Sequence, residues 1–270
     1  MTVATAAPSL GHTLDISSTR PVSFWRLVRV ELRKSYDTRA GMWLLLTIAL
    51  LTLAVEGIVL AVTTVQDEAM NFGDFVGAAA FVTSVLLPVL GIMLVTSEWG
   101  QRTAMVTFAL EPRRPRVILA KLVTGLVLTV ATAAFAITIG LACNLLYAAI
   151  QGQSPSWEFG FNFLVGFLII QSFAMLGGFA LAALLLNTPA AIVVFFIYKW
   201  VLPGLFALGS ALMGWFADLS PWIDFQAAQL PVQDLSVNGD EWGHLIVSGF
   251  LWLVLPLAIG LWRVLQAEVK

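Results

Sequence analysis

Residues 97–122, SEWGQRTAMVTFALEPRRPRVILAKL, lie between two long apolar segments and form the most basic turn of the chain. The basic residues of this stretch are Arg102, Arg113, Arg114, Arg116 and Lys121, set against Glu98 and Glu111. In its middle is an apolar segment, residues 104–110, that is too short to cross a bilayer. A basic turn with a short apolar helix inside it indicates a cytoplasmic turn that docks onto another component.

The composition outside this turn is that of a membrane protein. The chain has 270 residues, of which 59% are hydrophobic and 11% charged, whereas soluble domains average about 45–50% apolar and about 25% charged residues. The one cysteine, Cys143, lies in an apolar run and provides neither a disulfide framework nor a cysteine metal site. Residues 1–21 lack the apolar segment of a signal peptide, and we expect them to be a disordered cytoplasmic tail.

Six apolar runs are long enough to cross a bilayer, which takes about 20 residues per helix. They predict one all-α domain, residues 22–270, with transmembrane helices at about 41–62, 75–95, 118–150, 161–186, 190–216 and 243–262. The uncharged run 159–198 is divided at Pro189, because proline suits a helix start and disfavours helical backbone in the preceding residue.

Charged residues separate by side under this six-helix count. Apart from Lys199, Lys and Arg fall before the first helix, in the turn at 97–122 and after the sixth helix. The charged residues of the opposite loops are all acidic: Asp67, Glu68, Asp74, Glu158, Asp218, Asp224, Asp234, Asp240 and Glu241. Because cytoplasmic loops carry the excess of positive charge, both termini are predicted to be cytoplasmic.

The segment before the first span, residues 22–39, is predicted to be an amphipathic helix. Apolar residues recur at three- and four-residue steps on one face: Trp25, Val28, Leu32 and Tyr36. Basic residues do so on another face: Arg26, Arg29 and Arg33. Glu31 can pair with Lys34 one turn later. Such a helix lies among lipid headgroups, either as a simple anchor or as an element that also touches a further subunit.

Two stretches together resemble the permease subunits of type-2 ATP-binding-cassette (ABC) exporters. Residues 30–43, VELRKSYDTRAGMW, resemble the family's pre-membrane helix running into its first span. In the bacterial family, the second cytoplasmic stretch has Glu, an aromatic residue, Gly-Thr, then Pro, several Arg and a Lys. The matching residues are Glu98, Trp99, Thr103, Pro112, Arg113, Arg116 and Lys121. Arg102 stands where the family has glycine, which here is at Gly100.

This resemblance implies an exporter subunit in the bacterial cell membrane that moves a hydrophobic or amphipathic substrate. Two such chains, expected to be a homodimer, would pair above two ATP-binding subunits, which would bind ATP and Mg while this chain binds no cofactor. Residues 214–242 would form an extracellular re-entrant segment. The turn would contain a coupling helix that contacts the ATPase through Glu98, Arg102, Thr103, Phe108, Pro112, Arg113, Arg116 and Lys121. The helix before the first span would contribute Arg26, Arg29, Glu31, Arg33 and Lys34.

Two charges lie inside predicted spans. Lys199 is about 15 Å past Pro189 and Glu56 about 22 Å past Gly41, at about 1.5 Å per residue. A lysine at the centre of a membrane helix costs about 2.5–3.5 kcal/mol on insertion scales. Two interpretations stay open: Lys199 forms a structural ion pair with Glu56, or it faces a cavity or subunit seam and contacts cargo.

The sequence carries no signature of catalysis by this chain. A phosphate-binding loop needs glycine directly before its lysine, and the four lysines follow Arg33, Ala120, Tyr198 and Val269. Neither His12 nor His244 has a metal-ligand partner at helical spacing. Topology accounts for the basic residues, so nucleic-acid binding is not needed to explain them.

Three alternatives to the exporter remain. A secondary transporter would show inverted repeats or matching broken helices, which the sequence lacks. An integral enzyme would gather several polar residues at one depth, whereas only Glu56 and Lys199 lie deep. An accessory membrane anchor for an ATPase is also compatible with the sequence. Transport by a purified complex in liposomes would distinguish an exporter from such an anchor. The apolar path weakly favours lipids, hydrophobic peptides or amphipathic drugs as cargo.

Overall fold

A computed structural model of the chain describes residues 22–66, 68–101, 103–157 and 160–266. The first half is α1 (Phe24–Asp37), α2 (Arg39–Gln66), α3 (Phe72–Gly100), α4 (Ala104–Leu110), α5 (Arg114–Gln151) and α6 (Phe161–Leu185). The second half is α7 (Thr188–Phe196), η1 (Ile197–Val201), α8 (Leu202–Leu212), α9 (Gly214–Ile223), α10 (Phe225–Ala228), η2 (Leu230–Val232), α11 (Asp240–Gly249), η3 (Phe250–Val254) and α12 (Leu255–Gln266). The predicted tail, residues 1–21, and Arg102 lie outside the described residues.

Six helices of the described chain are long and apolar enough to cross a membrane, which confirms the predicted count and a multi-pass membrane protein. They are Arg39–Gln66, Phe72–Gly100, Arg114–Gln151, Phe161–Leu185, Thr188–Leu212 and Asp240–Gln266. The third begins at Arg114, before the predicted residue 118, because its first polar turns continue the helix beyond the apolar run. The fifth ends at Leu212 rather than at 216, since the extended backbone of Met213 separates it from α9.

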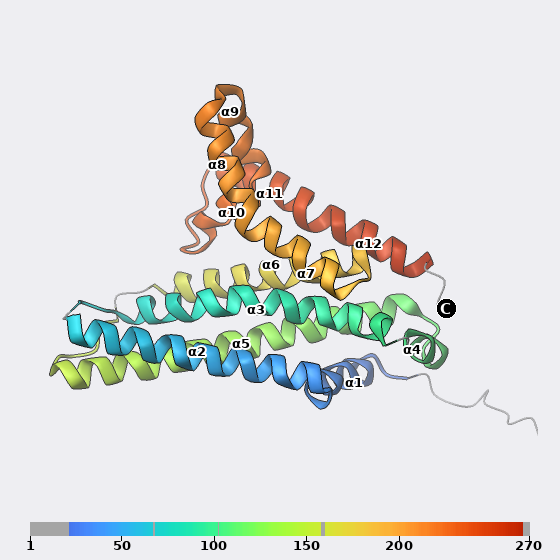
Figure 1. Cartoon of the computed structure of the whole chain (residues 1–270), viewed down its shortest axis with the longest axis horizontal. Helices are drawn as coiled ribbons and strands as arrows, with labels where there is room; N and C mark the ends of the chain where they lie inside the picture. The colour runs from blue at the N-terminus through green and yellow to red at the C-terminus, as the bar shows by residue number, and fades with distance from the viewer. Residues whose placement is uncertain (1–21, 67, 102, 158–159, 267–270) are drawn as a thin grey trace, which may run out of the picture.

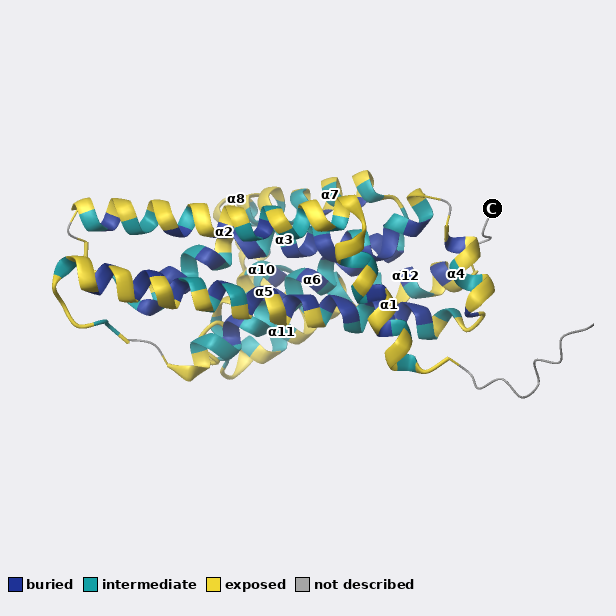
Figure 2. Cartoon of the chain, turned by 90° about the horizontal axis from the view of Figure 1, so that it is seen from below, coloured by how far each residue is buried: buried dark blue, intermediate teal, exposed yellow. Residues whose placement is uncertain are grey.

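Four of the spanning helices form a bundle and the other two lean away from it (Figure 1). Helices α2, α3, α5 and α6 run side by side, whereas α7–α8 and α11–α12 diverge toward the end where α9 lies. Helix α3 is the most buried of the six and packs most extensively against α6. Figure 2 shows exposed residues along much of α2 and buried residues gathered toward the centre of the bundle.

Glycines allow α3 and α6 to approach each other closely. A Cβ atom added at Gly178 would lie 2.2 Å from the carbonyl oxygen of Pro88, and one at Gly91 would lie 2.6 Å from that of Met175. Membrane helices commonly pack through such small residues, because dispersion contacts rather than the hydrophobic effect hold them together in lipid. The contact between α3 and α6 therefore depends on two glycines facing opposite backbones.

The fifth and sixth spans each contain a π-helical turn directly ahead of a proline. η1 ends at Val201 and Pro203 follows, and η3 ends at Val254 and Pro256 follows. Proline lacks the N–H that a regular α-helix would donate to the preceding turn, and a π-turn is one way in which a helix accommodates such a gap. The two turns meet through the rings of Tyr198 and Trp252, whose centroids are 5.0 Å apart.

The segment between α8 and α11 folds back along α6. Phe225 is buried and lies 5.5 Å, between ring centroids, from Phe173 of α6. A Cβ atom at Gly166 of α6 would lie 2.1 Å from the carbonyl oxygen of Gln233. Backbone of this segment therefore packs directly on a membrane-spanning helix.

Candidate functional site: a ring of four charges

Four charged side chains from α1, α3 and α5 close a ring of ion pairs. Nζ of Lys34 lies 2.7 Å from Glu31 Oε1 and 2.7 Å from Glu98 Oε1. Nζ of Lys121 lies 2.8 Å from Glu31 Oε2 and 3.3 Å from Glu98 Oε2. Each ammonium therefore contacts both carboxylates, and each carboxylate contacts both ammonium groups. We call Glu31, Lys34, Glu98 and Lys121 the charge ring.

Most of the charge ring is shielded from solvent. Glu31, Glu98 and Lys121 are 5%, 8% and 6% exposed, while the Lys34 side chain is 40% exposed. The two positive and two negative charges cancel, and buried charges are tolerated only when paired in this way. Burial lowers the pKa of Lys34, but the carboxylates of Glu31 and Glu98 outweigh it, so the pKa of Lys34 is raised above the ordinary 10.5. Lys34 therefore stays charged at neutral pH.

Helix α1 reaches the charge ring by packing on the start of α5. The hydroxyl of Thr124 on α5 donates a hydrogen bond of 3.3 Å to the carbonyl of Val28. Val28 and Glu31 are the buried residues of α1. Trp25 and Tyr36, expected to share the apolar face with Val28, are 70% and 51% exposed. The packed side of α1 therefore runs through Val28 and Glu31, and Trp25 and Tyr36 point away from it.

The short helix α4 is joined to the charge ring through Glu98. The hydroxyl of Thr107 donates to Glu98 Oε1 over 3.0 Å, and the backbone N–H of Thr103 donates to the carbonyl of Glu98 over 2.9 Å. The ring of Phe108 lies 6.4 Å, between centroids, from that of Trp99 on α3. Helix α4 is thus attached to the last turn of α3.

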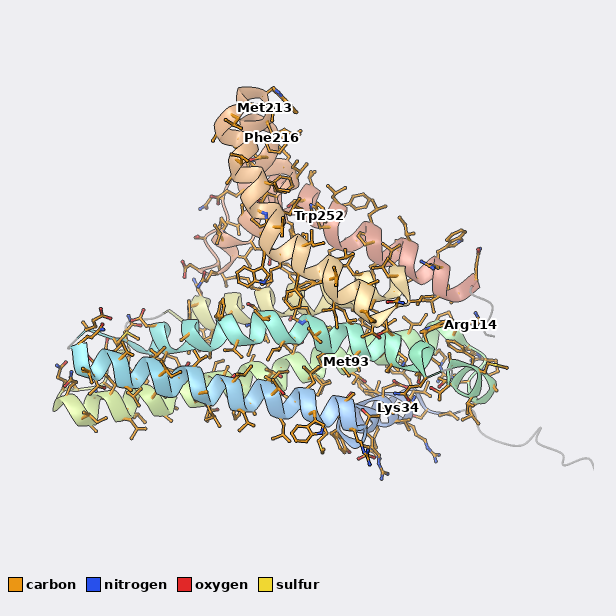
Figure 3. All side chains as sticks on the ribbon, viewed as in Figure 1. Lys34, Met93, Arg114, Met213, Phe216 and Trp252 are labelled. Carbon is orange, nitrogen blue, oxygen red and sulfur yellow. The ribbon has the colours of Figure 1, made fainter. Side chains whose placement is uncertain are left out.

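Arg114 connects α4 to the far end of the chain. Its guanidinium lies 4.9 Å from the centroid of the Phe108 ring. It also donates hydrogen bonds to the carbonyls of Val264 and Leu265, over 3.2 and 3.1 Å, near the end of α12. Figure 3 shows Lys34 and Arg114 at the same end of the molecule, where α1, α4 and the end of α12 lie.

A cavity of about 710 Å³ opens between α1 and α4 beside the charge ring. Leu44, Leu45, Leu90 and Leu94 line its apolar side, while Lys34 and Glu98 border its polar side. Because this space separates α1 from α4, contact between the two helices is limited and α4 is held mainly from α3. The cavity leaves room for α4 to tilt relative to α1.

One side of α4 is exposed rather than packed against the other helices. Met105 and Leu110 are 54% and 78% exposed, whereas Ala104 is buried. Leu110 borders the cavity, but Met105 does not. This exposed apolar side differs from those of the spans because it lies on a seven-residue helix, which is too short to cross a bilayer.

The structure brings only some of the predicted site residues together. Glu98 and Lys121 of the turn meet Glu31 and Lys34 of α1, and the predicted pairing of Glu31 with Lys34 is present at 2.7 Å. Thr103 is hydrogen-bonded to the backbone of Glu98, and Phe108 contacts Trp99 and Arg114. The sequence had given no reason to place Lys121 against α1.

The remaining basic residues lie outside the charge ring. Arg116 pairs with Glu111 at 3.1 Å and donates to the carbonyl of Val22 over 2.8 Å, which ties the start of α5 to the start of α1. Arg33 pairs with Asp37 at 2.7 Å on the exposed side of α1. The other residues predicted to belong to the site, Arg26, Arg29, Pro112 and Arg113, are exposed.

Two contributors to the site were not singled out from the sequence. Thr107 lies in an apolar helix with nothing nearby to mark it, and Arg114 was one of several arginines in the turn. Thr107 reaches Glu98 across the turn between α3 and α4, nine positions away, whereas Arg114 reaches Val264 on α12, 150 positions later. Both contacts depend on how α4 and the start of α5 pack on the other helices.

The proposed pairing of Glu56 with Lys199 is wrong for this structure. Glu56 is fully buried on α2, where its carboxyl forms no ion pair among the described residues and has the Cys143 thiol and the backbone of Ala79 as its polar neighbours. Lys199 lies on η1, where its Nζ is 5.8 Å from the centroid of the Trp200 ring. Helix α3 packs against α2 and α7, and its Phe81 contacts Trp200 of η1 with ring centroids 5.9 Å apart. Matching depth along separate spans did not bring them together.

Replacing Glu56 by leucine is expected to raise the free energy of unfolding by about 1–3 kcal/mol, because the change removes a buried carboxyl that no cation of the described chain pairs with. Glu56→Gln is the matched control, since it keeps a polar group of the same size in the same place, and it should give no such gain. Thermal unfolding of the purified protein in detergent measures both. A lower melting temperature for Glu56→Leu would show that the carboxyl is stabilised in the native protein.

No protein-family model matches the chain, and no curated protein matches it. Among the described residues, no group of three or more His, Cys, Asp or Glu side chains is placed to hold a metal ion. The functional assignment therefore depends on the geometry of the charge ring and of α4.

Proposed function

We propose that this chain is the membrane subunit of an ABC exporter, acting as a homodimer above two ATP-binding subunits that bind ATP and Mg. The observation that carries the proposal is the attachment of α4. A short helix between the second and third spans exposes Met105 and Leu110 on one side, and Thr107 joins its other side to the charge ring. This is the arrangement that a coupling helix requires.

The contacts of α4 offer a route by which force on it reaches the spans. Displacement of α4 acts on α3 through Thr107 and Glu98, and the charge ring extends that contact to α1 and α5. Arg114 extends it to the end of α12. Because the charge ring is closed, sliding one helix past another would separate buried opposite charges, which is costly. The joined helices are thus favoured to move as a unit.

The same proposal gives the chain its orientation. Helix α1, α4 and the end of α12 lie at one end of the molecule, and this end would face the cytoplasm of a bacterial cell. The exposed Trp25 and the exposed basic side chains of α1, Arg26 and Arg29, would then contact the headgroups of the inner leaflet. The segment between α8 and α11 would be the re-entrant structure on the outer side.

Met105→Asp tests docking on α4. Met105 is exposed and lies outside the cavity, and an acidic residue in the first turn of a helix does not oppose helix formation. Tagged chain purified from its native membranes is expected to bring down an ABC-type ATP-binding subunit, and the variant should reduce its recovery by about tenfold or more, as loss of an interface anchor does.

Val65→Asp is the matched control for this experiment. Val65 is 85% exposed, and its replacement by aspartate adds the same charge near the end of α2, away from α4. Equal recovery of the ATPase with both variants would contradict docking through α4. ATP hydrolysis without movement of any amphipathic cargo in liposomes would favour an accessory anchor over an exporter.

A further inference from the structure

A second, smaller cavity lies halfway along the fifth span. It has a volume of about 70 Å³ and is lined by α3, α6, α7, η1, α10 and η3. Its polar and aromatic lining includes Ser84, Tyr198, Lys199, Gln226, Gln229 and Trp252. Lys199 is the twelfth of the 25 residues in the span Thr188–Leu212, counted from Thr188. A cationic side chain near the middle of a membrane helix therefore lines this cavity.

Lys199 has no counter-ion within the described part of the chain. It forms no ion pair or hydrogen bond there, and its ammonium lies 5.8 Å from the centroid of the Trp200 ring. The carboxylate of Asp224, two positions before the cavity residue Gln226, instead caps α10 by accepting from the backbone N–H groups of Gln226 and Ala227. A lysine in this position is costly unless it is paired or reaches water.

Two residues that line the cavity, Trp252 and Gln229, use their N–H groups in hydrogen bonds to the backbone. Lys199 is therefore the charged donor that faces the cavity. Trp252 Nε1 donates to the carbonyl of Ile223 over 2.7 Å, and Gln229 Nε2 donates to that of Phe225 over 2.9 Å. Both π-turns line the site, through Tyr198 and Lys199 of η1 and Trp252 of η3. Such turns often mark functional sites in helices, and here two from different spans border one cavity.

We propose that this cavity binds the anionic headgroup, a carboxylate or a phosphate, of an amphipathic molecule, with Lys199 as its counter-ion. Because one water molecule needs about 10–15 Å³ of space on the same measure, a volume of about 70 Å³ admits a small polar group but not a whole amphipath. The hydrocarbon chain would lie along the exposed apolar surface of the same spans, at Val194 and Val254. The inference rests on the proposed export function and names its substrate class.

Binding can be measured on the full chain alone, in nanodiscs of zwitterionic phosphatidylcholine. A brominated long-chain fatty acid and the matching brominated fatty alcohol are compared by quenching of tryptophan fluorescence, since Trp252 lines the cavity and Trp200 adjoins it. The fatty acid is expected to bind about tenfold more tightly, as a charge-assisted hydrogen bond provides. Lys199→Gln should abolish that preference and Lys199→Arg should retain it.

Arg39→Gln is the control, because it removes an exposed cation at the start of α2, away from the cavity. A preference that persists in Lys199→Gln, or that Arg39→Gln removes equally, overturns the proposal. Inorganic phosphate is the third probe, and its displacement of the fatty acid would show a site for free anions rather than for an amphipath. Loss of the preference concerns this cavity alone, whereas failure to recover an ATP-binding subunit concerns the exporter assignment.

Discussion

Replacing Lys121 by methionine is expected to lower the free energy of unfolding by about 3–5 kcal/mol, the cost of breaking a buried ion pair from one side. Lys121 is 6% exposed and contacts Glu31 at 2.8 Å and Glu98 at 3.3 Å. Without it, two buried carboxylates remain with Lys34 as their shared cation in the charge ring. Methionine fills a similar volume, so the loss measures charge rather than packing.

Chemical unfolding of the purified protein, followed by tryptophan fluorescence, measures this effect against two further variants. Lys34→Met should cost less, because the Lys34 side chain is 40% exposed and solvent already screens its charge. Adding Glu31→Gln to Lys121→Met should recover part of the loss, since Lys34 and Glu98 then balance each other. A larger loss from Lys34→Met than from Lys121→Met would contradict the closed ring.

Gly178→Ala is expected to lower the free energy of unfolding by about 1–3 kcal/mol, the usual cost of overpacking, or more. The added Cβ would lie 2.2 Å from the carbonyl oxygen of Pro88 and 2.8 Å from its carbonyl carbon. Backbone atoms cannot rotate aside as a flexible side chain can, so α3 and α6 would have to separate. Since α3 packs most extensively on α6, the change should affect the whole bundle.

Gly177→Ala provides a control one residue away in the same helix. Its Cβ would meet only Cε2 of Phe195, at 3.8 Å, which is an ordinary contact. Alanine also favours helix over glycine by up to about 1 kcal/mol, so Gly177→Ala should be neutral or stabilising. Thermal unfolding of both variants in detergent decides the matter, and equal melting temperatures would show that α3 and α6 do not approach through Gly178.

Much of the helical framework could be predicted from local pattern. The apolar segment 104–110 forms α4 with the same bounds, Ala104–Leu110, because polar and charged residues with Gly100 precede it and charged, proline-containing sequence follows it. Six apolar runs became six helices of spanning length. The pairing of Glu31 with Lys34 followed from three-residue spacing on one helix. Each of these properties depends on neighbouring residues alone.

Contacts between distant residues were beyond the sequence. Nothing in residues 22–39 predicted that Glu31 would meet Lys121, 90 positions later, and nothing in the turn predicted that Arg114 would reach Val264, 150 positions later. Depth along each span gave Glu56 and Lys199 a plausible pairing, yet the two side chains do not pair in the structure, where α3 packs against α2 and α7.

The sequence by itself determined that this is a helical membrane protein with six spans and a basic turn that contains a short helix. Tertiary structure alone decided which charges close the ring and which, like Lys199, lie without a counter-ion in the described chain. Hydropathy and helical period are set by adjacent residues, whereas an ion pair between helices depends on how those helices rotate and cross. That rotation is fixed by close packing at positions such as Gly91 and Gly178, whose partners lie far away in the sequence.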